Sequence, residues 1–338
     1  MMKAFPGAPL HTALFEPQAT FDGFSGGVVK PMPLNAVPGL RRHHRLALPA
    51  LARAFSRHHV EAEVVLCSSS GWAHGVEAHG AKFVYCYTPA RWLYDTERYT
   101  QGWPVARPIA RTLRAPLVRW DKRAASTADR YLTLSFAVKR RIADSYGIEA
   151  EVLHPPTTLD PTGPQEPVEG QAAGFYLCIS RLLPYKNVGA IVAAFEQLPS
   201  RRLVIVGTGP ERQQLQRRAG TNVQLIGSVS DAQLRWLYAN CLAVVAAGHE
   251  DFGLSPIEAA AFGKPSAVLQ WGGYLDSIVP DETGTFFAQP DPAHIAEAVD
   301  RLDQTHWCEH ALRAQAARFA EPRFIARLQE IVSESMTS

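Results

Sequence analysis

The sequence predicts a two-domain α/β protein whose second half holds a parallel sheet covered by helices on both faces. The chain has 338 residues, more than one ordinary hydrophobic core accommodates. Five prolines and three glycines between Pro155 and Gly174 interrupt any packed element there. After this segment, short apolar runs alternate with helical patterns, which is typical of a doubly wound sheet.

We therefore place an N-terminal domain at 1–160, a linker at 161–173 and a C-terminal domain at 174–318. The C-terminal domain is expected to have strands at 175–180, 202–207, 223–227, 243–247 and 266–269. Its helices are expected at 188–198, from 211, from 230 to 238 and at 294–303. A last helix in 319–338, apolar on one face from 322 to 332, is expected to pack back on the N-terminal domain.

The N-terminal domain is less regular. Strands are predicted at 64–67, 82–87 and 131–134, and each ends in small or polar residues. The opening segment of about 45 residues is rich in proline and glycine and has little strand signal.

Composition indicates an ordinary soluble globular protein, with 46% hydrophobic and 20% charged residues. No apolar run approaches the ~18 residues of a membrane span, and the first residues lack the apolar core of a signal peptide. The five cysteines are an odd number without a CxxC pair, so we expect buried reduced thiols in a cytoplasmic protein. Neither a disulfide framework nor a metal site is indicated.

Charge is distributed unevenly, with a net +7 in residues 1–160 and −5 in the remainder. The densest basic stretch, 107–123, alternates cations with apolar residues. Its cations are Arg107, Arg111, Arg114, Arg119, Lys122 and Arg123. This pattern fits an amphipathic helix lying on an anionic membrane, and it equally fits a solvated helix face. Nucleic acid is a weaker candidate, because no aromatic stacking platform accompanies the charge.

The strongest motif contains Glu250 and Glu258, eight positions apart. It follows the apolar run 241–247 and leads into a small-residue helix at 259–263. A helix start offers unpaired N–H groups and a positive dipole end, which suit an anion. Two carboxylates there would repel a bare phosphate, but they suit a sugar nucleotide, whose hydroxyls they can bind.

A second motif, Ser180 to Lys186, lies between a predicted strand and helix. Arg181 and Lys186 can both reach one diphosphate, the arginine as a planar fork and the lysine as a point charge. Alone, these would be two exposed loop cations. The Glu250 motif, however, follows a neighbouring strand of the same predicted sheet. The turns at 207–210 and at 272–274 are weaker signals, because plain tight turns explain their glycines equally well.

Together these residues resemble the retaining glycosyltransferases of family 4. The family signature E-x7-E corresponds to Glu250 and Glu258, and its S-R-x-x-x-x-K segment to Ser180–Lys186. Residues 68–75 and 88–92 look like the mannosyltransferases of polysaccharide and O-antigen assembly. The resemblance implies a GT-B fold, with two doubly wound Rossmann-like domains facing a cleft.

The resemblance also implies a role for each motif residue. Arg181 and Lys186 would bind the donor diphosphate, Glu258 the nucleotide ribose, and Glu250 the transferred sugar. The remaining donor contacts would come from the loop Phe252, Gly253, Leu254, Ser255 and, around the base, from Gly207, Thr208, Gly209, Gly227 and Val229. Charge on the leaving diphosphate would be stabilised by these cations without a metal or another cofactor.

Two departures from the family concern the N-terminal domain. The family commonly has histidine where this chain has Tyr87, so the acceptor-side candidates are Tyr87, Arg91 and His74; a structural hydrogen bond is the alternative for His74. Family members usually begin with a buried strand and a Gly-Gly turn, and neither precedes Lys3. We therefore expect a truncated or internally started chain whose first domain lacks its first strand.

The predicted function is transfer of a hexose, mannose from GDP-mannose, to a saccharide or lipid-linked acceptor in cell-surface polysaccharide synthesis. The protein would be cytoplasmic and would contact the inner membrane face through 107–123. A different class of function stays open: a truncated protein that binds a nucleotide sugar but is only the inactive partner of an active enzyme. A phosphorylase or epimerase on the same fold fits less well, because no pyridoxal lysine site or epimerase constellation is found.

Overall fold

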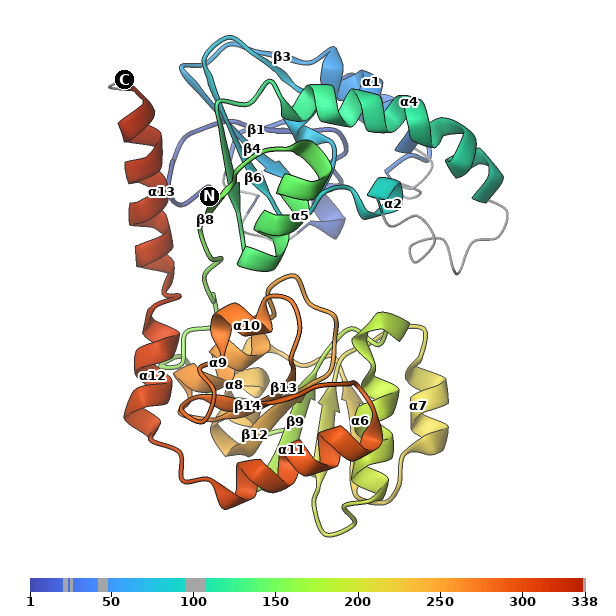
Figure 1. Ribbon diagram of the computed structural model, residues 1–338, viewed down its shortest axis with the longest axis vertical. Coiled ribbons are helices and arrows are strands. Elements are labelled where there is room, and N and C mark those ends of the chain that lie inside the picture. Colours follow the sequence, from blue (N-terminus) through green and yellow to red (C-terminus); the bar gives the residue numbers. More distant parts are fainter. Residues whose placement is uncertain (21–23, 25–26, 42–47, 95–106, 337–338) are drawn as a thin grey trace. The chain divides into compact units, whose positions relative to one another are not determined.

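The computed structural model describes residues 1–20, 24, 27–41, 48–94 and 107–336 (Figure 1). The chain divides into two compact units. Unit 1 comprises Met1–Leu134, Val138–Leu153 and Ile325–Ser338, and unit 2 comprises Ser135–Ala137 and His154–Phe324. The chain therefore passes between the units more than once.

The boundary lies at 153/154 rather than in the predicted linker, and residues 161–173 belong to unit 2. The prolines mark irregular backbone, but packing decides where a unit ends. The last strand of unit 1, β8 (Glu151–Val152), ends just before the boundary, whereas the His154 ring packs on Phe252 of unit 2. The final helix, α13 (Glu321–Met336), begins in unit 2 and belongs to unit 1 from Ile325 onwards.

Unit 2, whose residues are all described, is built on one parallel sheet. Its strands are β9 (Phe175–Ile179), β10 (Leu203–Val206), β11 (Val223–Gly227), β12 (Cys241–Ala246), β13 (Ser266–Leu269) and β14 (Gly284–Phe287). The spatial order is β11-β10-β9-β12-β13-β14. The five strands predicted from apolar runs are confirmed, and β14 was not predicted.

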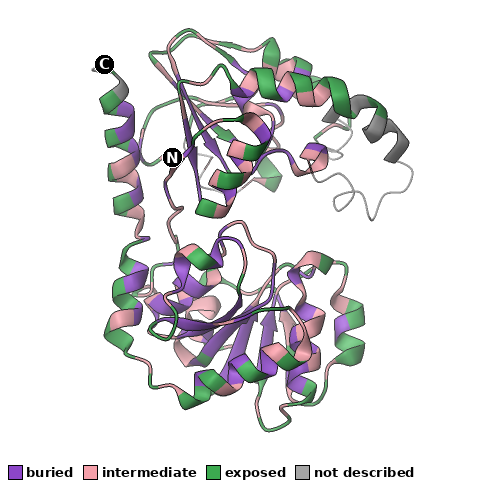
Figure 2. Ribbon diagram, viewed as in Figure 1, coloured by how far each residue is buried: buried purple, intermediate pink, exposed green. Residues whose placement is uncertain are grey.

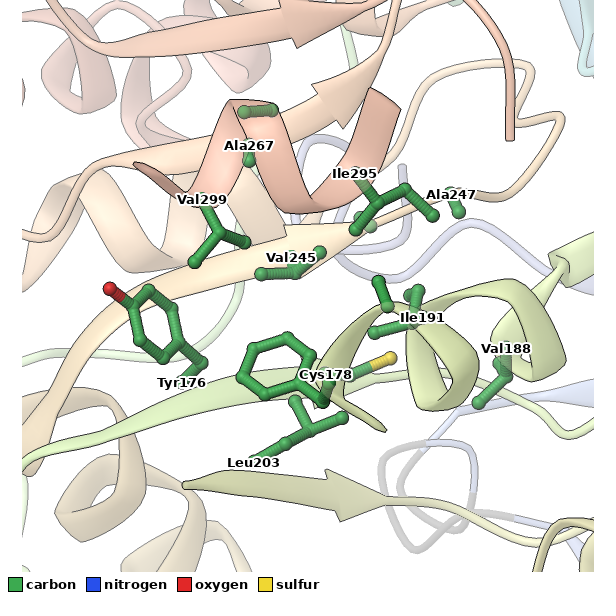
Figure 3. Close-up of a cluster of buried hydrophobic side chains, with 14 of the residues drawn as sticks. Tyr176, Cys178, Val188, Ile191, Leu203, Val245, Ala247, Ala267, Ile295 and Val299 are labelled. Atoms are coloured by element: carbon green, nitrogen blue, oxygen red, sulfur yellow. The ribbon is translucent and has the colours of Figure 1, made fainter. Parts of the chain in front are cut away.

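Successive side chains along a strand point to opposite faces of the sheet and pack into different apolar clusters, so both faces of this sheet are apolar. Tyr176 and Cys178 lie in one buried cluster, whereas Phe175 and Leu177 lie in another. Figure 3 shows the first cluster, in which Ile191 and Ile295 from two helices meet strand residues. Buried positions accordingly fill the strands in Figure 2.

Helices cover the sheet of unit 2. They are α6 (Val188–Glu196), α7 (Arg212–Arg218), α8 (Asp231–Asn240), α9 (Ser255–Ala261), α10 (Tyr274–Ser277), α11 (Pro292–Gln304) and α12 (Glu309–Ala317), with a 3-10 turn at Pro184–Lys186. Local capping fixes some starts: Ser230 Oγ accepts from Gln233 N at 3.1 Å and the Gln233 side chain accepts from Ser230 N at 3.0 Å, a capping box for α8.

Unit 1 has a parallel sheet of β4 (Val64–Ser69), β6 (Ala81–Cys86), β7 (Arg130–Thr133) and β8, in that order. The three predicted strands are confirmed as β4, β6 and β7. Short strands pair separately: β1 (Leu10–Thr12) with β2 (Val29–Pro31), and β3 (His59–Val60) with β5 (Glu77–Ala78). The opening segment thus contains two strands that the sequence pattern did not predict.

The helices of unit 1 surround this sheet. They are α1 (Leu48–Ser56), α2 (Arg91–Tyr94), α4 (Arg107–Ala125) and α5 (Phe136–Tyr146), the last beginning in unit 2, with 3-10 turns at Pro17–Ala19, Pro33–Ala36 and Ala73–Gly75. Among the described helices, none combines the length and apolar character that a membrane span requires.

The C-terminal part of α13 is tied to unit 1 by shared ion pairs. Arg327 contacts Glu151 at 2.7 Å and Glu334 at 3.1 Å, and Arg130 contacts the same two carboxylates at 2.8 and 3.0 Å. The Gln329 amide also donates to Ala4 O at 2.7 Å. These contacts explain why residues 325–338 group with unit 1.

The thiols agree in part with the expectation of buried reduced cysteines. All five cysteines are free, and four are buried, but Cys308 is exposed. Burial raises the pKa of Cys178 and of Cys241 to about 12, so these two thiols stay protonated at neutral pH.

Candidate functional site

The predicted donor residues of unit 2 lie at the carboxyl edge of its sheet. Strand β9 leads into Ser180–Asn187 and β12 leads into Ala247–Leu254. Because β9 and β12 are neighbours in the sheet, the two loops are adjacent. The adjacency expected from the sequence is therefore found, and this edge is where ligands bind in open α/β sheets.

The ammonium group of Lys186 contacts the carboxylate of Glu250 in a charge-assisted hydrogen bond across 64 positions. Lys186 is 8% exposed, so its charge is largely removed from water and needs this partner. The ammonium also lies 5.0 Å from the centre of the Tyr185 ring, a cation–π contact. The side chain of Glu250 stays 26% exposed and can face a ligand.

Asn187 holds the two loops together, a role the sequence analysis missed. Its backbone is left-handed (φ 54°, ψ 29°), a conformation that asparagine tolerates better than most residues. Its side-chain amide donates to Ala247 O at 2.8 Å, and His249 N donates to Tyr185 O at 3.1 Å. These bonds fix the backbone on both sides of the Lys186–Glu250 pair.

Arg181 belongs to the same loop but is exposed. Its guanidinium donates to the Tyr185 hydroxyl at 3.1 Å. The structure thus brings Lys186 directly to Glu250, while Arg181 is oriented through Tyr185.

The Glu250–Ser255 loop is packed against the turn that precedes α10. Gly273 N donates to Glu250 O at 3.1 Å, and a Cβ at Gly273 would lie 2.1 Å from Phe252 Cα. Only glycine permits this approach. Phe252 is buried, with its ring 5.4 Å from the His154 ring and 5.7 Å from the Phe319 ring. The loop is therefore anchored from several sides.

After the buried Phe252 the loop becomes more exposed. Leu254 is 39% exposed, and Ser255 is the first residue of the short helix α9. The N–H groups of Gly253 and Leu254 form no hydrogen bond with any other described residue. They are available donors near Glu250, and their contact with the transferred sugar stays a prediction.

Glu258 lies in the first turn of α9 and accepts a hydrogen bond from the Tyr238 hydroxyl at 2.6 Å. Burial raises the pKa of this carboxyl, and the tyrosine bond opposes the rise. Tyr238 thereby fixes one carboxylate oxygen of the predicted ribose-binding residue, a partner not recognised in the sequence.

The predicted base-binding residues follow β10 and β11. Gly207 has a φ of 141°, and a Cβ there would lie 1.8 Å from Ser180 O, so this turn requires glycine. Gly207 N donates to Gly227 O at 2.7 Å, and Thr208 O accepts from Leu182 N at 2.9 Å. Gly209 continues the turn. Val229 is part-buried and packs against the core, and Gly227 is buried.

On the side of unit 1, the acceptor candidates occupy different environments. His74 is fully buried: its Nε2 lies 2.9 Å from Asp121 Oδ1 and its Nδ1 lies 3.3 Å from Ser69 Oγ. The structure therefore favours a structural hydrogen bond over contact with an acceptor for His74. Tyr87 is 38% exposed and Arg91 is half-buried at the start of α2, and both stay candidates.

The basic stretch 107–123 forms most of α4, but the side chains of Arg107 and Arg111 are outside the described residues. Arg119, Lys122 and Arg123 are exposed and form no ion pair with any described residue. Arg114 is also exposed and donates to Leu93 O at 2.8 Å. Buried Asp121 ties α4 to the rest of unit 1, because it is hydrogen-bonded to His74 at 2.9 Å and accepts from the Tyr94 hydroxyl at 2.9 Å. No group of three or more potential metal ligands occurs within the described part of the chain.

Residues 164–318 match the family model "Glycosyl transferases group 1". This matched segment includes every predicted donor-site residue above. The whole chain resembles the sucrose-phosphate synthase of Thermosynechococcus elongatus, with a TM-score of 0.71 at 17% identity over 97% of this chain and 89% of that one. At this identity the likeness concerns the fold, which is GT-B with two Rossmann-like units.

Two curated relatives are similar in sequence. The human alpha-1,3/1,6-mannosyltransferase ALG2 is 26% identical over 251 residues, which are 64% of this chain and 58% of that protein. A GDP-mannose-dependent alpha-(1-6)-phosphatidylinositol dimannoside mannosyltransferase of Mycobacterium tuberculosis is 33% identical over 117 residues, 34% of this chain and 30% of that protein. The match thus spans less than two thirds of either relative.

Proposed function

We propose that this protein is a retaining glycosyltransferase of family 4. It moves mannose from GDP-mannose to a saccharide or lipid-linked acceptor in the synthesis of cell-surface polysaccharide or O-antigen. The names of the two mannosyltransferase relatives support the choice of donor and sugar. The reaction takes place in the cytoplasm, at the inner membrane face, and uses neither a metal nor another cofactor.

The observation that carries the proposal is the Lys186–Glu250 contact. It joins two motifs 64 positions apart and places a cation and a partly exposed carboxylate at one point of the sheet edge. A structural ion pair would need neither the N–H groups of Gly253 and Leu254, which form no hydrogen bond with a described residue, nor a second, exposed cation at Arg181. A sugar nucleotide uses all of these groups.

The chemistry follows from the charges. As the bond between the sugar and the diphosphate breaks, negative charge grows on the leaving phosphate oxygens. Lys186, held by Glu250, and Arg181, oriented by Tyr185, stabilise that charge. Positive charge grows on the anomeric carbon, and the free oxygen of Glu250 stabilises it. Glu258, fixed by Tyr238, accepts from the ribose hydroxyls.

The test combines binding with turnover. A thermal-shift panel of GDP-, UDP- and dTDP-sugars identifies the donor, since a ligand at 100 times its Kd stabilises the native state by about 2.7 kcal/mol. Lys186→Ala and Glu250→Ala are then compared with Lys139→Ala, which removes a lysine from an exposed ion pair with Glu149. We expect kcat to fall by about 10²- to 10³-fold in both site variants, because each removes one group that stabilises charge in the transition state.

Wild-type turnover in either site variant would contradict the role assignment. Binding of a nucleotide sugar without turnover on any saccharide or lipid-linked acceptor would instead favour the inactive partner. The retaining outcome is read from the anomeric proton of the product by NMR, and an inverted product would refute that part of the proposal.

A further inference from the structure

Arg212 lies at the first position of α7, directly after the Gly207–Pro210 turn (α7 in Figure 1). Its backbone N–H donates to Gly209 O at 3.2 Å, which anchors the residue to the turn. Its guanidinium lies over the end of β11, where a Cβ at Gly227 would come within 2.7 Å of a guanidinium nitrogen. The charged group is thus held at the carboxyl edge of β10 and β11.

Within the described part of the chain, the Arg212 guanidinium has no hydrogen bond and no ion pair. Other half-buried arginines of unit 2 have partners: Arg201 contacts Asp300 at 2.5 Å and Asp303 at 2.7 Å. Arg212 is also partly buried, and partial burial of an unpaired cation carries a desolvation cost. A ligand at this edge would use the five N–H donors that no described residue engages.

The strand order tells which part of a nucleotide sugar Arg212 faces. The order is β11-β10-β9-β12, with Lys186 and Arg181 after β9 and Glu250 after β12. At ~4.8 Å between strands, the end of β11 lies about 10 Å from that of β9 and about 15 Å from that of β12. A donor with its sugar at Glu250 and its diphosphate at Lys186 extends towards β11 with its nucleobase. Arg212 therefore faces the base rather than the phosphates.

The hydrogen-bonding groups of the nucleobases indicate which nucleotide Arg212 would bind. A guanidinium fork donates two parallel hydrogen bonds to the O6 and N7 acceptors of guanine. Adenine presents an N6 amino donor where guanine has O6, and a pyrimidine such as uracil has no N7. We propose that Arg212 reads the nucleobase of the donor and selects guanosine diphosphate over uridine and adenosine diphosphates. This inference rests on the proposed function, which it narrows to one class of donor.

Calorimetric titration with GDP, UDP and ADP tests the assignment on the full-length protein. Arg212→Gln removes the fork, Arg212→Lys keeps a point charge, and Arg217→Gln removes an exposed arginine of the same helix as the matched control. We expect the wild type and Arg217→Gln to bind GDP most tightly. Both Arg212 variants should lose about 10- to 100-fold in GDP affinity, the size of one bidentate base contact, and keep their UDP affinity.

Three results would overturn the inference: unchanged GDP affinity in Arg212→Gln, equal losses for GDP and UDP, or full recovery of GDP affinity in Arg212→Lys. The last two results would place the guanidinium at the diphosphate, because a point charge such as that of lysine is enough to bind a phosphate group. Circular dichroism and thermal unfolding of each variant verify the fold. If the wild type binds no nucleoside diphosphate or nucleotide sugar, the proposed function itself fails, and that outcome is distinct from the other three.

Discussion

The carboxylate of Asp276 accepts a hydrogen bond from the backbone N–H of Phe136, 140 positions earlier, at 2.8 Å. Phe136 is the first residue of α5, so Asp276 supplies an acceptor for a helix start, although it lies far away in sequence. The side chain of Asp276 is 5% exposed and its Oδ2 lies 3.8 Å from His154 Nδ1. This carboxylate therefore connects α10, next to the Glu250–Ser255 loop, with the residues at which the chain enters unit 2.

Asp276→Ala should lower the free energy of unfolding by about 1–3 kcal/mol, because it removes a buried charged acceptor from a backbone donor. Asp276→Asn keeps an acceptor oxygen and should cost less. Asp144→Ala, an exposed position on α5, is the matched control, and its effect should stay within about 0.5 kcal/mol. Urea denaturation measures all three. An alanine variant as stable as the control would show that the Asp276 bond contributes little.

Gly207 and Gly189 should respond to alanine in opposite directions. At Gly207 the added Cβ would lie 1.8 Å from Ser180 O with φ at 141°, so the turn must shift, at a cost of about 2–3 kcal/mol or more. At Gly189, inside α6, the nearest atom is 3.8 Å away, and alanine should stabilise by about 0.5–1 kcal/mol. Thermal unfolding of the two variants checks the pair, and equal effects would contradict the close contact with Ser180.

The His11–His58 pair should make the stability of unit 1 depend on pH. His11 Nδ1 and His58 Nε2 lie 2.7 Å apart. Burial lowers the pKa of each ring, and for His11 the neighbouring His58 and Lys30 lower it further, as His59 does for His58. The folded protein therefore keeps both rings neutral to a lower pH than the unfolded chain, which takes up protons near pH 6.5.

The free energy of unfolding should thus be highest above pH 6.5 and fall as the pH drops from 6.5 towards the lowered pKa values. The double variant His11→Gln/His58→Gln should weaken this dependence between pH 7.5 and 5.5, as measured by chemical denaturation at each pH. His310→Gln, on exposed α12, is the control for the loss of an imidazole. A double variant with the full wild-type slope would exclude the pair as its source.

The exposed cations of α4 should bind anionic vesicles. Each cation near such a surface contributes ~1 kcal/mol, so Arg119→Gln/Lys122→Gln should weaken binding to phosphatidylserine vesicles about 30-fold. Arg217→Gln/Arg218→Gln removes the same charge from α7 and should have little effect. Co-sedimentation at low salt measures both, with phosphatidylcholine as the uncharged surface. Equal losses in the two variants would leave a solvated helix face as the explanation of the basic stretch.

Much of unit 2 could be predicted from local pattern. The strand segment Phe175–Cys178 has apolar side chains on both of its faces. The Ser230/Gln233 capping box indicates the start of α8. Strand β14 was missed because Thr285, between Gly284 and Phe286, breaks its short apolar run. Strands β1 and β2, each three residues long, leave too few positions for a pattern.

Only those parts of the site that lie within a single motif could be predicted from the sequence. Strand ends and charge placed Lys186 and Glu250 at one edge, because each follows an apolar run. The partners that fix them depend on tertiary contacts: Tyr238 holds Glu258 from another helix, and Asn187 reaches Ala247 across 60 positions. The burial of His74 against Asp121 is of the same kind, since 47 residues separate the two in sequence.

The interleaved order of the units limits how such a protein can change by recombination. A segment exchanged at 164–318, the bounds of the family match, would carry Asp276 and Phe252 to a new host without Phe136 and His154. The incoming domain would then have a buried carboxylate without its N–H donor and an aromatic ring without its stacking partner. Successful exchange between homologues must therefore bring residues 135–137, His154 and Phe319 along with this domain, so inheritance of the predicted donor site is tied to short pieces of chain that lie outside the match.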